Sequence, residues 1–176
     1  MSKPYVIVFA GVPGSSKSIV AYSLSIAFSL PIFSTDNIRN EVKEDLLVSD
    51  INETEALKEF EHRQGKRFQE ILKLKQSFIR DGSVDRHWQE IKEQLHTAGY
   101  TWCLIDMELS RDFMINLYSK TNRVRAIEEL DAYLAQHTNF MKKYSSDITV
   151  KITNSLFKER NSVAEAGVRK FLENFL

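Results

Sequence analysis

The stretch that decides the fold is Tyr5–Ser18, which reads YVIVFAGVPGSSKS. Its first six residues form a continuous apolar run rich in β-branched and aromatic side chains. A run without alternation is typical of a strand covered on both faces, as in a parallel sheet. Glycine and proline then interrupt it, and residues 18–30 have the composition of a buried helix that Pro31 stops. We therefore predict a strand, a tight loop and a helix in succession.

The loop Gly11–Ser18 has the residues that phosphate binding requires. Small residues allow backbone N–H groups to converge on oxygen atoms, and the following helix N-terminus adds partial positive charge. A lysine can reach the terminal phosphates, and a hydroxyl can bind magnesium. We expect every residue of this loop to contribute to nucleotide binding, with Ser18 also at the metal: Gly11, Val12, Pro13, Gly14, Ser15, Ser16, Lys17 and Ser18.

The loop departs from the strict pattern G-x-x-x-x-G-K-[ST] at one position, where Ser16 replaces the second glycine. A β-carbon there is expected to crowd a phosphate or the adjacent strand. Serine is a small replacement, and its hydroxyl can still face a phosphate. The alternative interpretation is a Gly/Ser turn with an incidental lysine, but the flanking strand and helix favour the phosphate-binding loop.

Helices and strands alternate along the rest of the chain. Further strands are predicted at residues 32–34, 83–85, 101–107 and 148–153. Further helices are predicted at 35–47, 53–81, 87–98, 123–137, after Ser110 and from about Leu156, with Thr35 or Asp36 capping the helix 35–47. The alternation predicts one α/β domain over residues 1–176, a three-layer fold with a mostly parallel sheet of about five strands flanked by helices.

Composition excludes several classes of protein. Lys plus Arg and Asp plus Glu both total 24, and this balance argues against extensive binding of nucleic acid. The one cysteine, Cys103, cannot form an internal disulfide and fits a reducing compartment. Residues 18–35 carry no charge, but five serines and Pro31 interrupt them, so we expect a buried helix and strand there instead of a membrane span. We expect a cytoplasmic protein.

The chain resembles the P-loop kinases of the zeta-toxin and polynucleotide-kinase type. The resemblance rests on Gly11–Ser18, on the segment Ser34–Arg39, and on the strand Asp147–Val150 with Asn154. It implies that ATP and Mg²⁺ bind, that Asp36 accepts the proton of the attacking hydroxyl, and that Arg39 holds substrate or phosphate. The alternative is that Asp36 is only a helix N-cap and that Arg39 lies on a solvated face.

The resemblance also implies a carboxylate near the metal and an arginine over the phosphates. Asp85, after the short strand 83–85, is preferred for the metal by strand order, and Asp106 competes because it ends a better apolar run. Asn116 occupies the position where such kinases carry the first lid arginine. We therefore assign the lid role to Arg123, with Lys120 and Arg125 as further cations and an exposed helix start as the alternative.

Two helical regions are expected to serve the reaction, residues 37–81 on the substrate side and residues 110–145 as a lid. A basic face suits an anionic acceptor, although such faces are usually solvated: Arg63, Lys66, Arg67, Lys73 and Arg80. The expected activity is transfer of the γ-phosphoryl group of ATP to a hydroxyl of a small molecule or a nucleic-acid end. The alternative is a nucleotide-binding module with weak or no transfer. Neither the acceptor, the choice of ATP over GTP nor the oligomeric state follows from the sequence.

Overall fold

The computed structural model describes residues 3–47, 52–123 and 125–174. Its centre is a parallel sheet of five strands in the order β2-β3-β1-β4-β5. The bounds are β1 Tyr5–Ala10, β2 Ile32–Ser34, β3 Phe78–Ser83, β4 Thr101–Glu108 and β5 Ile148–Thr153. The predicted three-layer α/β fold is confirmed. Because all strands run the same way, the residues that follow them meet at one edge of the sheet, the carboxyl edge.

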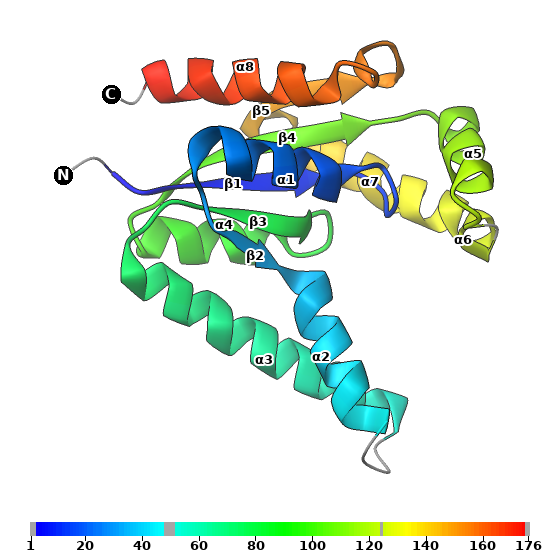
Figure 1. Cartoon of the computed structure of the whole chain (residues 1–176), viewed down its shortest axis with the longest axis horizontal. Helices are drawn as coiled ribbons and strands as arrows, with labels where there is room; N and C mark the ends of the chain where they lie inside the picture. The colour runs from blue at the N-terminus through cyan, green and yellow to red at the C-terminus, as the bar shows by residue number, and fades with distance from the viewer. Residues whose placement is uncertain (1–2, 48–51, 124, 175–176) are drawn as a thin grey trace.

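Helices cover both faces of the sheet (Figure 1). On one face, α1 (Lys17–Phe28) and α8 (Arg160–Glu173) pack with Ile7 and Phe9 of β1. On the other, α3 (Glu53–Leu74) and α4 (Trp88–Thr97) pack with Val6 and Val8. Adjacent residues of β1 thus point into different cores, which explains why the sequence of this strand does not alternate.

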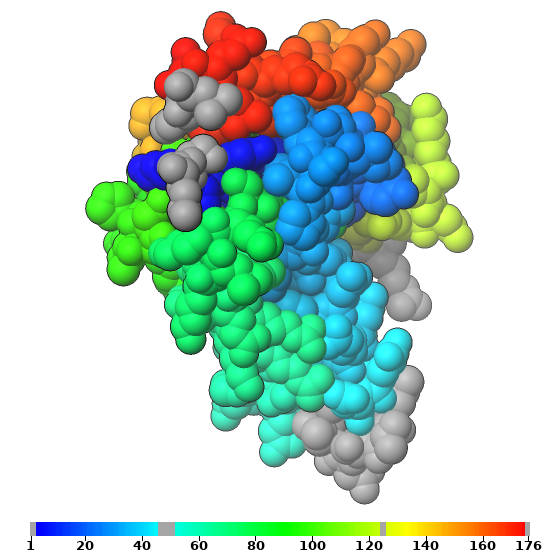
Figure 2. All heavy atoms as spheres, turned by 60° about the vertical axis from the view of Figure 1, so that its left-hand side comes forward, coloured from blue at the N-terminus to red at the C-terminus, as the bar shows by residue number. Residues whose placement is uncertain are grey.

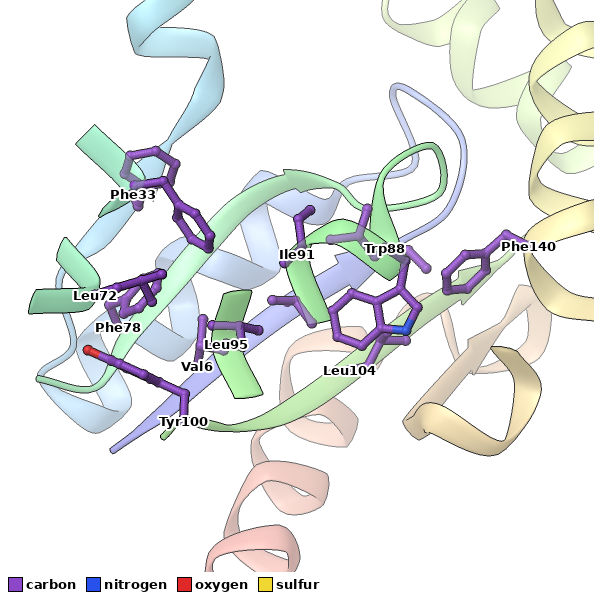
Figure 3. Packing of buried hydrophobic residues seen from close by; sticks show 14 of the residues in the cluster. Val6, Phe33, Leu72, Phe78, Trp88, Ile91, Leu95, Tyr100, Leu104 and Phe140 are labelled. Carbon is purple, nitrogen blue, oxygen red and sulfur yellow. The ribbon is translucent and has the colours of Figure 1, made fainter. Parts of the chain in front are cut away.

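The second of these cores is dominated by aromatic residues (Figure 3). Phe68 of α3 and Tyr100 both make edge contacts with Phe78 of β3. Trp88 of α4 is 1 % exposed and packs edge-on against Trp102, with the ring centroids 5.7 Å apart. Phe140 of α7 (Leu130–Tyr144) closes the same core. The core therefore fixes α3, α4 and α7 relative to the central strands.

The predicted helix over residues 53–81 is wrong at its C-terminal end. It ends at Leu74, Lys75 has a left-handed backbone with φ 56°, and β3 follows. Residues 78–80 therefore belong to a central strand between β1 and β2, and the predicted short strand 83–85 is replaced by Phe78–Ser83. The error arises because Phe78 and Ile79 continue the helical spacing by chance, and no glycine or proline precedes them.

Strand β3 is irregular at its end. Val8 pairs with Arg80 but Phe9 pairs with Ser83, so Asp81 and Gly82 bulge out of the ladder with β1. Gly82 has φ 141°, and a Cβ there would lie 2.5 Å from the Oγ1 of Thr35. Thr35 Oγ1 also donates a hydrogen bond to the Asp81 carbonyl. The glycine thus allows the start of α2 (Thr35–Leu47) to approach the bulge.

Three other boundaries differ from prediction. The cap of α2 is Ser34, whose Oγ accepts a hydrogen bond from the Asn37 N–H, and not Thr35 or Asp36. The helix predicted over 123–137 is two helices, α6 (Arg125–Glu128) and α7. The final helix, α8, begins at Arg160, after the 3₁₀ turn η2 (Asn154–Leu156). The predicted cap Ser110 of α5 (Arg111–Lys120) is confirmed, since its Oγ accepts from the Phe113 N–H.

Helices α2 and α3 form a hairpin that projects from the body of the molecule (Figure 2). Arg67 of α3 forms two hydrogen bonds with the Glu41 carboxylate of α2, and Arg63 binds both Asp45 and Glu59. Arg80 is not on the helix but buried in β3, 4 % exposed. The basic face predicted for the long helix is therefore partly neutralised within the hairpin and lacks Arg80.

Candidate active site

The loop between β1 and α1 depends on two glycines with left-handed backbones. Gly11 has φ 120°, and a Cβ on it would lie 2.9 Å from Met107 of β4. Gly14 has φ 76°, and a Cβ there would lie 2.7 Å from the Tyr118 ring of α5. Either Cβ would require the neighbouring residues to move, so the predicted glycines are needed both for conformation and for space.

Ser16 is also left-handed, with φ 72° and ψ 20°. A glycine adopts this conformation freely, whereas a side chain there costs roughly 1–2 kcal/mol. The strict motif requires glycine at this position for that reason. Ser16 precedes α1 without a side-chain hydrogen bond that caps the helix, so no capping bond offsets the strain.

Lys17 is buried within the loop and is 8 % exposed. Its Nζ donates to the carbonyls of Gly11 and Val12, at 2.8 and 2.7 Å, and to Ser15 Oγ at 3.2 Å. Burial lowers the pKa of Lys17 to about 8, against the opposing influence of four carboxylates, those of Asp85, Asp81, Asp36 and Asp106. The ammonium group is thus buried at the centre of the loop, and Lys17 is not an incidental surface lysine.

Ser18 contacts a carboxylate that the sequence analysis did not select. Its Oγ donates a 3.1 Å hydrogen bond to Asp81 Oδ1 at the bulge of β3. Burial raises the pKa of Asp81, as does the nearby charge of Asp36, while the bond from Ser18 opposes them. The sequence analysis missed Asp81 because it assigned residues 78–81 to the long helix. Had these residues been predicted as a short strand, Asp81 would have been expected at the carboxyl edge of the sheet.

Asp36 and Arg39 lie together in the first turns of α2. They form an ion pair of 2.5 Å in which both side chains are at least half exposed. The Arg39 guanidinium also lies 4.8 Å from the centre of the Phe60 ring of α3. The charge of Asp36 affects both Lys17 and Asp81, so its carboxylate belongs to the same edge of the sheet. Since Ser34 caps α2, capping does not account for Asp36.

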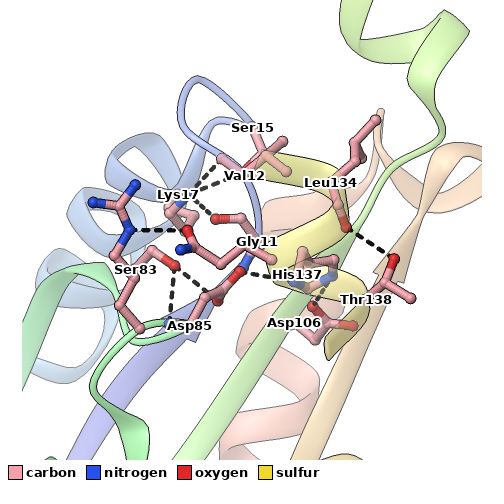
Figure 4. Close-up of polar contacts among 12 residues, drawn as sticks. Gly11, Val12, Ser15, Lys17, Ser83, Asp85, Asp106, Leu134, His137 and Thr138 are labelled. Atoms are coloured by element: carbon pink, nitrogen blue, oxygen red, sulfur yellow. Dashed lines mark hydrogen bonds and ion pairs between the residues drawn. The ribbon is translucent and has the colours of Figure 1, made fainter. Parts of the chain in front are cut away.

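Asp85 is bonded to the start of the loop, to Ser83 and to His137 (Figure 4). Its Oδ1 accepts the Gly11 N–H at 3.0 Å and the Ser83 hydroxyl at 2.8 Å. Its Oδ2 lies 2.9 Å from His137 Nδ1 of α7. Burial acts to raise the pKa of Asp85, but His137 and these hydrogen bonds prevail and lower it. Asp85 therefore positions the first residue of the loop, and Asp81 is the acid nearest to Ser18.

His137 joins Asp85 to the second candidate acid, Asp106. Asp106 lies in β4 beside Ala10, is fully buried, and has Oδ1 3.3 Å from His137 Nε2. Burial acts to lower the pKa of His137, but the two carboxylates outweigh it and raise the pKa to about 9. Figure 4 shows the imidazole between the two acids, below the loop. No sequence spacing identified this histidine, because its partners are far away along the chain.

The region after β4 packs over the loop. The Tyr118 hydroxyl donates to the Pro13 carbonyl, and the Nη1 of Arg123 would lie 3.3 Å from a Cβ on Gly14. The structure therefore brings Arg123, the predicted lid residue, against the loop. Among the described residues, no hydrogen bond or ion pair joins Asn116 or Lys120 to the loop. The Arg125 side chain lies outside the described part of the chain.

A groove of about 400 Å³ opens at the carboxyl ends of β4 and β5, the two strands next to β1 on one side. It is lined by Glu108, Leu109, Ser110, Thr153, Asn154 and Ser155. Asn154, part of the resemblance, exchanges hydrogen bonds with Ser110 and so joins β5 to α5. Asp147, also part of it, binds Trp88 and Lys92 of α4 and so has a structural role.

The donor set near Ser18 suits a hard cation. A hydroxyl and a carboxylate are oxygen ligands of the kind that Mg²⁺ uses together with water and substrate phosphates. Among the described residues, no group of three or more His, Cys, Asp or Glu side chains could hold a metal by itself. The residues present therefore fit a magnesium ion that arrives with a phosphate ligand.

Comparisons with known proteins identify the class of this fold. No family model and no curated protein matches the sequence, but many solved structures match the fold. A gluconokinase from Sinorhizobium meliloti superposes with a TM-score of 0.64 at 16 % identity, covering 99 % of this chain and 97 % of its own. A structure from the PezAT toxin–antitoxin system of Streptococcus pneumoniae gives 0.59 at 13 % identity, covering 98 % and 88 %.

The APS kinase of Mycobacterium tuberculosis, solved with AMPPNP and APS, gives a TM-score of 0.56 at 15 % identity, covering 98 % of this chain and 99 % of its own. These similarities show that the chain has the P-loop kinase fold, as the sequence resemblance implied. Among the helices of the described residues, none combines the length and the apolar character needed to span a membrane.

Proposed function

We propose that the protein is an ATP- and Mg²⁺-dependent cytoplasmic kinase that transfers the γ-phosphoryl group to a hydroxyl of a small-molecule or nucleotide-like acceptor. The observation that carries the proposal is the hydrogen bond between Ser18 and Asp81, directly beside the loop that holds Lys17. It joins a phosphate-binding loop to an acid suited to a metal. Structural similarity to kinases supports the same class of activity.

On the nucleotide side, the backbone N–H groups of Gly11–Ser18 would surround the phosphates, and Lys17 would neutralise the transferring group. For Lys17 to do so, its Nζ must exchange the carbonyls of Gly11 and Val12 for phosphate oxygens. Ser18 and Asp81 would hold magnesium, which supplies charge neutralisation at the phosphates when bound. Arg123, against Gly14, would cover the loop from the lid region 110–145.

On the acceptor side, Asp36 would orient the attacking hydroxyl and accept its proton. Its position in the first turn of α2 keeps it exposed to an incoming molecule, and Arg39 would hold the acceptor or its phosphate. The α2–α3 hairpin, within the region 37–81, would provide the wall of the acceptor site. The groove lined by Ser110 and Asn154, at the ends of β4 and β5, lies across β1 from β2 and the hairpin and would be on the nucleotide side.

The test is ADP formation from Mg²⁺-ATP, measured with a panel of sugars, sugar acids, nucleosides, nucleotide sugars and 5′-hydroxyl oligonucleotides. We expect one acceptor class to raise ADP formation well above the rate with water. Lys17→Met should abolish nucleotide binding. Asp36→Asn should preserve nucleotide binding and lower the transfer rate by about 10²–10⁴-fold, the usual contribution of a general base.

Asp45→Asn is the matched control, because Asp45 lies on the same helix but pairs with Arg63 at the surface of the hairpin. It should leave both binding and transfer unchanged. Nucleotide binding without turnover across the whole panel would instead support a nucleotide-binding module. The strained Ser16 is the observation that favours this second candidate, because it alters the loop that holds the reacting phosphates.

A further inference from the structure

The two carboxylates beside His137 determine its charge. The residue is 6 % exposed on α7, and its two ring nitrogens face two different carboxylates, Asp85 at 2.9 Å and Asp106 at 3.3 Å. Nδ1 is hydrogen-bonded to Asp85, whereas Nε2 faces Asp106 at ion-pair distance without a hydrogen bond. Carboxylates on both sides of the ring favour its charged form. The arrangement therefore corresponds to a positively charged imidazolium between two negative charges.

Lys17 is another cation whose charge acts on these acids, but its Nζ bonds the carbonyls of Gly11 and Val12 and not a carboxylate. Asp106 is fully buried, and neither of its carboxylate oxygens has a hydrogen-bond partner among the described residues. Asp85 receives hydrogen bonds from Gly11 and Ser83, but these donors are neutral. Without the imidazolium, two carboxylates would remain in the protein interior with only the Lys17 ammonium, the group that a polyphosphate needs, to compensate them, which is unfavourable.

These acids are close enough to the loop to influence what it binds. Asp85 is hydrogen-bonded to the first N–H of the loop, and Asp106 lies in β4 beside the residue that precedes the loop. The charges of both acids act on Lys17, with that of Asp85 the larger. Uncompensated, they would repel a polyphosphate and retain the lysine ammonium that the polyphosphate needs.

We propose that His137 is a positioning residue for the nucleotide: its positive charge offsets one of the two negative charges of Asp85 and Asp106, so that the loop can accept a polyphosphate, and it ties α7 to the start of the loop. The inference rests on the proposed function only in assuming that the loop binds a nucleoside triphosphate. It differs from a purely structural role because it makes nucleotide affinity depend on the balance of charge, which a second substitution can restore.

The experiment is calorimetric titration with Mg²⁺-AMPPNP at pH 7.5 of the wild type, His137→Gln, Asp106→Asn and the double variant. We expect His137→Gln to weaken binding by at least about tenfold, because two negative charges near the loop lose their partner. The double variant should recover to within about threefold of the wild type, since it removes one of those charges. His96→Gln is the matched control, on the exposed surface of α4, and should bind as the wild type does.

Asp106→Asn alone keeps the test decisive if His137→Gln does not fold. It should bind AMPPNP at least as tightly as the wild type, because it removes one of the two negative charges beside the loop and keeps the imidazolium. Melting temperatures of all variants without nucleotide separate loss of folding from loss of affinity. Unchanged affinity in folded His137→Gln, failure of the double variant to recover, or weaker binding by Asp106→Asn would overturn the proposal. Absence of AMPPNP binding by the wild type would instead contradict the proposed function itself.

Discussion

The α2–α3 hairpin and the carboxyl edge of the sheet both contain many charged residues, but they differ in how those charges are paired. On the hairpin, each of Arg63 and Arg67 meets a carboxylate at a partly exposed surface. At the carboxyl edge, Lys17 and Asp106 are buried, and their partners are backbone carbonyls and a histidine. Exposed ion pairs contribute about 0–1 kcal/mol each, whereas a buried charge carries a desolvation cost that its partners must offset.

The difference suggests that the hairpin charges stabilise a projecting structure and that the edge charges serve binding and catalysis. Each of the following predictions tests one side of that comparison, in order of decreasing expected effect.

The largest expected effect is a pH dependence of stability that originates at the carboxyl edge. Because the pKa of His137 is raised to about 9, its contribution to stability is complete below about pH 6.5 and is lost as pH rises toward 9. Between pH 6.5 and 8, the free energy of unfolding should fall by up to about 2 kcal/mol. Chemical denaturation at several pH values measures this. The lowered pKa of Lys17, about 8, acts in the opposite sense, but only above pH 8.

His137→Gln should remove this fall, and His96→Gln should retain it. An equal pH dependence in His137→Gln would show that the buried pair is not its origin. Because the ion pairs of the hairpin are exposed, Glu41→Gln should change stability by less than about 1 kcal/mol and leave the pH dependence as it is.

The next effect concerns the metal. Asp81→Asn should weaken the affinity for Mg²⁺-ATP by about tenfold, because an amide is a poorer ligand for magnesium than a carboxylate. Binding of ATP measured in EDTA should change much less, since the loop itself is intact. Asp45→Asn, a hairpin acid, is the control and should behave as the wild type in both conditions. If Asp85→Asn were to reduce the magnesium-dependent part more than Asp81→Asn, the metal would belong to Asp85.

The smallest effect is expected at Ser16. Ser16→Gly relieves a left-handed side chain but also makes the unfolded chain more flexible, so the two contributions partly cancel. We expect a net stabilisation of no more than about 1 kcal/mol in thermal or chemical unfolding. A destabilised Ser16→Gly would mean that the serine side chain makes a favourable contact that outweighs its backbone strain.

Local sequence determined much of this fold. The loop Gly11–Ser18 lies between a buried strand and a helix because its signals are contiguous: an apolar run, two glycines and a lysine. The strand Ile148–Thr153 was predicted with its observed bounds for the same reason. The error at Phe78 shows the limit of such signals, because a short apolar run fits a helix as well as a central strand until its partners are known.

The candidate site was only partly accessible from sequence. Asp36, Arg39 and Arg123 were selected because the resemblance to P-loop kinases implies roles for them, and the structure brings all three to the carboxyl edge or the loop. Asp81 and His137 were missed, because their importance depends on pairings between distant segments, 63 residues for Ser18 with Asp81 and 52 for Asp85 with His137. Tertiary contacts of this range leave no periodic trace in one sequence.

The bulge at the end of β3 has a mechanical consequence. Thr35, the first residue of α2, is bonded to the Asp81 carbonyl across the space that Gly82 leaves free. A rigid-body swing of the hairpin about its base must therefore either break this bond or displace the aspartate whose side chain meets Ser18. The base of the hairpin and the acid beside Ser18 are thus joined by this hydrogen bond and by the pairing of Ser34 with Asp81, so a displacement of one is transmitted to the other.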